Sequence, residues 1–202
     1  KAQLSVVRAD GTRERVAASM PRALRTDEMP RVVEDYRRAA RNARDAGFDG
    51  VEVHAANGYL INQFLSGSLN TRDDAWVGRL EHRMRLLMEA TNAAAEAFGH
   101  ARVGVRLSPL GSVADLPPAA DDRELAVRCA QELGRAGCAY LHLFNHHLPQ
   151  HGWNGLFDLA LAEEMKRGFG GPVVMNGYGL DVQAAQRDLD RGIADAVAFG
   201  KL

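Results

Sequence analysis

The fold is decided by the stretch Gly47-Phe48-Asp49-Gly50-Val51-Glu52-Val53-His54-Ala55-Ala56-Asn57-Gly58-Tyr59-Leu60-Ile61-Asn62-Gln63-Phe64-Leu65. Its first glycine is a residue that can end a helix, and the apolar, β-branched segment that begins at Val51 predicts a short strand. The Asn-Gly step that follows predicts a turn of the backbone at the end of this strand. His54, Asn57 and Tyr59 are therefore expected to cluster at a strand end, as the side chains of a reaction site would.

Length and composition exclude several classes of partner. The 202 residues are enough to bury a substantial core, which is typical of one domain or of a large part of one. The 25 Lys and Arg against 26 Asp and Glu give a net charge of −1, so electrostatics favours neither nucleic acid nor an anionic membrane as a partner. No apolar run approaches the roughly 20 residues that span a bilayer, and the first ten residues lack the layout of a signal peptide.

The two cysteines, Cys129 and Cys138, both lie in apolar periodic segments. They could pair, but buried free thiols in a reducing compartment are the favoured interpretation, so the expected location is the cytoplasm. The chain begins at Lys1 without a methionine and stops at Leu202 inside an expected strand. We therefore expect a piece of a longer protein.

Strand and helix patterns alternate along most of the chain. Residues 1–25 predict an irregular loop region, with a short hairpin as the alternative, and residues 26–202 predict β/α units of one partial domain. Five strands are expected, at 51–54, 103–107, 138–143, 172–175 and 194–199. A helix is expected before each of them: one capped by Thr26, then 80–98, 121–136, about 157–169, and one capped by Asp181. Residues 62–78 are expected to form a long polar loop.

The five strands are too apolar to have one face in water, which predicts a parallel sheet covered by helices. Five β/α units fit either an open doubly wound sheet or part of a (β/α)8 barrel. The pattern by itself does not decide between these two α/β architectures.

The motif His54-x-x-Asn57-x-Tyr59, followed by Leu60-Ile61-x-Gln63-Phe64-Leu65, identifies a family. With it, the chain from about Pro21 to Leu202 resembles the Old Yellow Enzyme family of FMN-dependent ene reductases, also called NADH:flavin oxidoreductases. The resemblance implies a (β/α)8 TIM barrel, of which this chain would hold strands four to eight. It also implies FMN as cofactor, NAD(P)H as reductant and a small-molecule activated alkene as substrate.

Two interpretations apply to His54 and Asn57. In the functional one, which the resemblance favours, both donate hydrogen bonds to the carbonyl oxygen of the substrate, and so stabilise the charge that develops when hydride reaches a conjugated C=C. In the structural one, His54 bonds to the backbone and Asn57 serves the turn.

Tyr59 and Arg106 each have a functional and a structural interpretation as well. A phenol with a pKa near ~10 is protonated at neutral pH, and the resemblance implies that Tyr59 gives its proton to the α-carbon; the alternative is packing against Leu60 and Phe64. Arg106 is a cation in an apolar strand, and needs an anionic or carbonyl-rich partner. The resemblance implies FMN as this partner; the alternative is an ion pair with a carboxylate such as Asp49 or Glu52.

Glycine turns follow the last two strands, at Gly177-Tyr178-Gly179 and Gly200-Lys201. Backbone N–H groups can approach a phosphate closely there, and barrels often bind phosphate after their last strands. Ordinary turn glycines are the alternative. The resemblance implies an arginine at position 201, and lysine keeps the charge but loses the bidentate fork.

His142, His146, His147 and His151 fit no recognised zinc spacing, so we expect no metal site and place these histidines in a loop on the substrate side. Two other functions remain as alternatives: an inactive barrel fragment or scaffold, and a phosphate-binding isomerase or lyase. The second would need a catalytic Lys or Glu at a strand end, and we expect Glu52 to point away from His54. The oligomeric state is open, with a homo-oligomer as one option.

Overall fold

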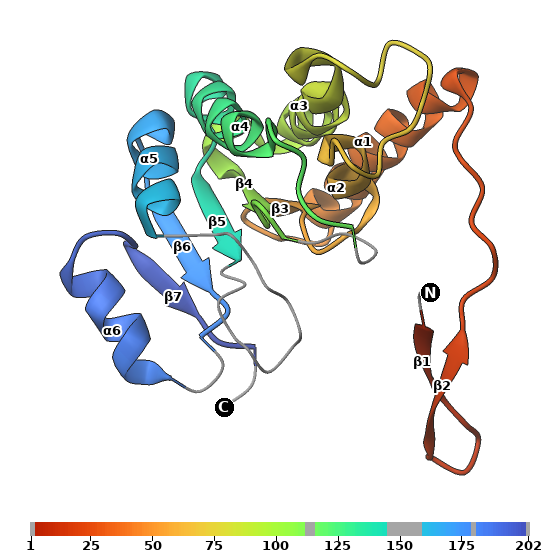
Figure 1. Cartoon of the computed structure of the whole chain (residues 1–202), viewed down its shortest axis with the longest axis horizontal. Coiled ribbons are helices and arrows are strands. Elements are labelled where there is room, and N and C mark those ends of the chain that lie inside the picture. Colours follow the sequence, from red (N-terminus) through yellow and green to blue (C-terminus); the bar gives the residue numbers. More distant parts are fainter. Residues whose placement is uncertain (1–2, 112–115, 145–158, 179–180, 201–202) are drawn as a thin grey trace.

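The computed structural model describes residues 3–111, 116–144, 159–178 and 181–200, and its centre is a five-stranded parallel sheet (Figure 1). The strands follow one another across the sheet in chain order: β3 (Val51–Ala55), β4 (Val103–Leu107), β5 (Tyr140–Phe144), β6 (Val173–Asn176) and β7 (Ala196–Ala198). Strands of a doubly wound sheet reverse their order at a switch point, whereas those of a (β/α)8 barrel do not. The observed order is that of a barrel segment.

Helices cover one side of this sheet (Figure 1). They are α1 (Met29–Asp45), α3 (Leu80–Phe98), α4 (Asp122–Ala136), α5 (Leu159–Phe169) and α6 (Val182–Asp190). Strand side chains alternate between the two faces, and the set that meets the helices is apolar and at most 4% exposed. We call this side the helix face; it carries Val53, Ala55, Val103, Val105, Leu107, Leu141, Leu143, Val173 and Met175.

The opposite side, which we call the inner face, is polar. Cα register places the following residues of neighbouring strands on it: Glu52, His54, Gly104, Arg106, Tyr140, His142, Phe144, Val174 and Asn176. Apart from Gly104, these residues are only partly buried or exposed. One row across the inner face runs from His54 through Arg106 and His142 to Val174.

The strand and helix predictions agree with the structure at most positions, and the helix expected from a Thr26 cap is an exception. Thr26 begins a 3-10 turn, Thr26–Glu28, and the α-helix starts only at Met29. The Thr26 hydroxyl instead donates to the Asp74 carboxylate at 2.5 Å. The cap at Asp181 is confirmed, because its carboxylate accepts the N–H of Ala184. A second 3-10 turn, His100–Arg102, leads into β4.

The long loop expected at 62–78 was wrong in its first part, because α2 (Leu60–Leu65) occupies it. Ile61, Phe64 and Leu65 are buried, at the spacing of one helix face. Asn70 fixes the segment that follows, since its side-chain amide donates to the carbonyls of Phe64 and Trp76 at 2.9 and 2.8 Å.

Residues 1–25, expected to be irregular, contain the hairpin that was the alternative. Strands β1 (Gln3–Val7) and β2 (Arg13–Ala17) pair antiparallel. The Asp10 carboxylate accepts the backbone N–H and the hydroxyl of Thr12, at 2.9 and 2.7 Å, which closes the turn between them. Figure 1 shows this hairpin apart from the five-stranded sheet.

Candidate active site

A tight turn at the carboxyl end of β3 presents Asn57. The N–H of Tyr59 donates to the carbonyl of Ala56 at 3.2 Å, and the two residues between them have positive φ, 57° at Asn57 and 77° at Gly58. Asn and Gly are the residues that tolerate this left-handed backbone. Asn57 therefore does serve the turn, and its side-chain amide oxygen is buried without a hydrogen-bond partner among the described residues.

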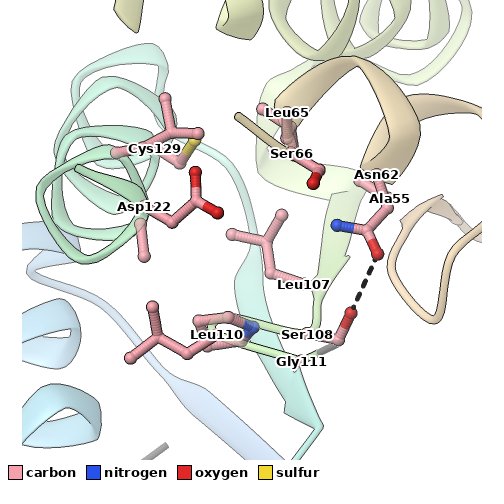
Figure 2. A pocket seen from close by; sticks show the side chains of 13 residues that line it. Ala55, Asn62, Leu65, Ser66, Leu107, Ser108, Leu110, Gly111, Asp122 and Cys129 are labelled. Carbon is pink, nitrogen blue, oxygen red and sulfur yellow. Dashed lines mark hydrogen bonds between the residues drawn. The ribbon is translucent and has the colours of Figure 1, made fainter. Parts of the chain in front are cut away.

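Two buried polar side chains hold this turn from outside it. The hydroxyl of Ser108, directly after β4, accepts the N–H of Asn57 at 2.7 Å. The amide oxygen of Asn62 on α2 accepts the N–H of Gly58 at 2.8 Å and the Ser108 hydroxyl at 3.4 Å (Figure 2). Sequence reasoning missed both residues. The available signal was a polar residue at the end of an apolar strand, and a second one inside an apolar helix face.

His54 lies on the inner face, beside the turn. Its ring centroid is 5.1 Å from that of Tyr59. Burial lowers the pKa of His54, and the nearby Arg106 charge lowers it further, so the imidazole is neutral at neutral pH. Its Nδ1 atom is buried and has no hydrogen-bond partner in the described part of the chain. The backbone bond proposed as the structural alternative is not observed there.

Tyr59 is not a core residue. It is 63% exposed and precedes α2 in an extended conformation, with φ −78° and ψ 177°. Leu60 packs against the hydrophobic core, and Phe64 is part of it, whereas Tyr59 stays outside. The phenol therefore lies in an open position next to His54.

Arg106 lies between His54 and His142 in register. Its guanidinium carbon is 5.5 Å from the centroid of the Phe144 ring. Its Nε atom is buried without a hydrogen-bond partner, and it makes no ion pair with any carboxylate of the described residues. The expected alternative, a structural pair with Glu52, is thus not present.

Glu52 points toward the same face as His54, so the expectation that it points away was wrong. The two residues are two positions apart, and strand side chains alternate with a period of two. The Glu52 carboxylate accepts a hydrogen bond from Nδ1 of His142 at 2.9 Å and interacts with the Tyr140 hydroxyl. His142 is accordingly a strand residue of the inner face and not a loop histidine. His146, His147 and His151 lie outside the described residues.

The two glycine turns follow neighbouring strands, since Asn176 at the end of β6 is paired with Ala198 at the end of β7. Gly177 has φ 104°, which requires glycine, and a Cβ at Gly200 would meet no atom within 4 Å. The Tyr178 hydroxyl donates to the Asp188 carboxylate at 2.8 Å. That side chain therefore holds α6, and the backbone carbonyl of Tyr178 accepts the N–H of Asp181 at 3.0 Å. Gly179 and Lys201 lie outside the described residues.

The pocket drawn in Figure 2 lies behind the turn, and Asn62 and Ser108, which hold the turn, line it. It has a volume of about 50 Å³ and lies on the helix side of the strand ends, between α2 and α4. Ala55, Leu107 and Cys129 line it, and none of the predicted site residues does. Burial raises the pKa of the Cys129 thiol to about 12, so this thiol is not reactive. We regard the pocket as a packing gap that is too small for a cofactor.

Three further observations bear on ligands and location. Cys129 and Cys138 are both free and buried, as expected. Within the described ranges, no three His, Cys, Asp or Glu side chains come together as metal ligands. None of the helices described is at once long and apolar enough to cross a membrane.

Comparison with known proteins matches the chain to one family model and to several similar sequences. A family model described as the NADH:flavin oxidoreductase / NADH oxidase family matches residues 4–202. The 12-oxophytodienoate reductase 1 of Oryza sativa subsp. japonica is 39% identical over 185 residues, which cover 91% of this chain and 48% of that protein.

Solved structures show a likeness to the same group of proteins. Morphinone reductase is 42% identical, with a TM-score of 0.88 over 98% of this chain and 52% of its own. An old yellow enzyme homologue from Zymomonas mobilis is 35% identical, with a TM-score of 0.81 over 92% of this chain and 52% of its own. The chain thus spans about half the length of these relatives. The likeness confirms the prediction that its five β/α units are part of a (β/α)8 barrel.

Proposed function

The chain belongs to the NADH:flavin oxidoreductase / NADH oxidase family, and on this premise we propose that its protein is an FMN-dependent oxidoreductase that reduces activated alkenes, such as enones, with NAD(P)H. One observation supports the proposal most directly. His54, Asn57 and Arg106 gather where β3 and β4 end, and Nδ1 of His54 and Nε of Arg106 are buried without a partner in the described part of the chain. A buried polar atom without a hydrogen-bond partner lowers stability, and proteins retain such atoms at sites where a ligand supplies the missing hydrogen bond.

FMN fits these residues. A flavin ring carries carbonyl oxygens and ring nitrogens along one edge, and the free guanidinium of Arg106 can bond to such an edge. The backbone N–H groups of Gly177, Tyr178 and Gly200, with the charge of Lys201, would hold the phosphate. Bound FMN supplies the hydride that the reaction needs. A solved morphinone reductase, 43% identical to this chain, is in complex with tetrahydroNAD, which supports a nicotinamide as the reductant.

His54 and Asn57 would bind the substrate through its carbonyl oxygen. A neutral imidazole has one N–H to donate, and the carboxamide of Asn57 has two. Negative charge develops on that oxygen when hydride adds to the β-carbon, so these donors bond more strongly to the transition state than to the substrate. The turn held by Ser108 and Asn62 fixes the donor of Asn57 before the substrate arrives.

Tyr59 would complete the reduction. Hydride adds to the β-carbon, and a proton must then reach the α-carbon. The phenol lies next to His54 in an exposed position, so it can reach a substrate held by His54. Its proton goes to carbon, and solvent restores it afterwards.

The alternatives have less support. An isomerase or lyase would need a free carboxylate or amine at the strand ends, but the hydrogen bond from His142 engages the Glu52 carboxylate, which also interacts with Tyr140. An inactive scaffold would not explain the unpaired polar atoms of the inner face. The cytoplasm as location, and a homo-oligomer as assembly, stay predictions.

The test is purification of the full-length protein, followed by release and identification of its cofactor. We expect a yellow protein that contains FMN and that oxidises NAD(P)H when an enone is added. A folded, colourless protein that does not bind added FMN would overturn the proposal.

A further inference from the structure

Among the residues that the structure describes, the inner face holds one carboxylate, that of Glu52, close to Arg106, which has no ion pair there. Glu52 lies on β3, diagonally across from Arg106 on β4, since Cα register pairs Glu52 with Gly104 and His54 with Arg106. The charge of Arg106 acts on Glu52 and contributes to lowering its pKa. A partly buried guanidinium normally pairs with a carboxylate within its reach, because an unpaired buried charge is costly. Here the two do not pair.

Two side chains of β5 explain why they do not. Nδ1 of His142 donates to Oε2 of Glu52 at 2.9 Å, and the hydroxyl of Tyr140 interacts with the same carboxylate. Burial raises the pKa of Glu52, but the hydrogen bond from His142 and the interactions with His142, Tyr140 and Arg106 outweigh it and leave a pKa below the ordinary value. The carboxylate is therefore charged at neutral pH, and it is held by His142 and Tyr140 on the β5 side.

Gly104 makes this arrangement possible. Tyr140 and Glu52 lie on strands that are not adjacent, and Gly104 of β4 stands between them in register. A Cβ at Gly104 would be 2.2 Å from Cζ of the Tyr140 ring. The ring thus occupies the space above a residue that has no side chain, and crosses β4 to reach Glu52. Any other residue at position 104 would block this path.

We propose that Tyr140 and His142 are positioning residues that hold the Glu52 carboxylate away from Arg106 and so keep the guanidinium free for an anionic or carbonyl-rich ligand. The inference rests on the proposed function, under which this ligand is the FMN ring. The Tyr140–Glu52–His142 bridge acts through Arg106 and does not itself touch the substrate. The bridge links β3, β4 and β5, and it leaves the positive charge of Arg106 unneutralised.

The test releases the carboxylate and then removes its charge. In the full-length protein, Tyr140→Phe combined with His142→Leu takes both polar partners from Glu52, which then turns to Arg106. We expect the Kd of FMN to rise roughly tenfold, the order expected for the loss of one charge-assisted hydrogen bond. Adding Glu52→Gln to this release variant should bring the Kd back to within about twofold of the parent, since glutamine has no charge to pair with Arg106.

A second readout is the reduction potential of bound FMN. A released carboxylate beside the flavin should lower this potential, because negative charge disfavours the anionic reduced ring, and Glu52→Gln should raise it again. Damage to packing would not be reversed by Glu52→Gln. Tyr36→Phe is the matched control, since Tyr36 lies on α1, away from the inner face, and it should change neither quantity.

The possible results distinguish a failure of the inference from a failure of the proposed function. If the parent binds FMN, and Glu52→Gln restores neither affinity nor potential in the release variant, the inference is overturned while the proposed function stands. If the release variant does not fold, Glu52→Gln alone decides, because the inference expects it to bind FMN at least as tightly as the parent; weaker binding would overturn the inference. A parent that does not bind FMN overturns the proposed function, and the inference with it.

Discussion

The helix face and the inner face belong to the same five strands, yet they meet different requirements. Alternate residues of each strand go to one face or the other. On the helix face, the side chains are apolar and at most 4% exposed, because helices of the same chain cover them. On the inner face, polar side chains retain buried atoms without a partner in the described residues, at His54, Arg106, His142 and Asn176. The comparison separates stability, which comes from the first face, from ligand binding, which comes from the second.

The largest effect is expected for a truncation on the helix face. Leu141 is 0% exposed among helices and strands, and Leu141→Ala should lower the free energy of unfolding by about 4 kcal/mol, through lost burial and a cavity. Urea denaturation of the full-length protein measures this change. Tyr59→Phe is the control at the end of the inner face and should stay within about 0.5 kcal/mol. A similar loss of stability in both variants would contradict the separation of the two faces.

The next effect concerns the donor pair of the inner face. His54→Ala or Asn57→Ala should reduce kcat for an enone by roughly 10²–10³, as expected when one donor to a developing oxyanion is removed. FMN should remain bound, which its absorbance spectrum reports. Both variants should also bind phenolic or enone ligands more weakly in titrations. Parent-like turnover of both variants would show that the pair is assigned wrongly.

A more selective effect is expected for Tyr59→Phe. The substitution removes one oxygen atom and little volume, so proton delivery should fail while packing persists. Stopped-flow measurements of the two half-reactions should show reduction of the flavin by NAD(P)H near the parent rate. Alkene reduction should slow about a hundredfold. Equal slowing of both half-reactions would instead indicate a structural role for the tyrosine.

The smallest effect is expected for a residue that supports the site from behind. Ser108→Ala removes the acceptor of the Asn57 N–H and should cost about 1 kcal/mol, seen as roughly fivefold weaker binding of an enone. Ser66→Ala is the matched control, because Ser66 is also buried but accepts only a long bond of 3.3 Å from the Leu69 N–H. If both variants weakened ligand binding equally, Ser108 would have no specific role in holding the site.

Several elements could be predicted because their signals are local. Strand β4 and helix α3 agree with the predicted bounds residue by residue. Helix α2 was missed because six residues are too few to show a period, although three of them share one buried face. The hairpin was only an alternative, since its strands alternate weakly and are mostly exposed. The Thr26 cap was wrong because Asp74, 48 residues away, competes for the hydroxyl.

The sequence by itself determined the alternation of strands and helices, the turn that follows β3, and the cluster of His54, Asn57 and Tyr59. These depend on periodicity, glycine and spacing within a few residues. Only the tertiary structure decided which side chains meet across strands. That Arg106 lies beside His54, and that Tyr140 crosses Gly104 to reach Glu52, depends on the register between strands. Register is set by the packing of distant helices and strands against one another, and no local pattern of residues specifies it.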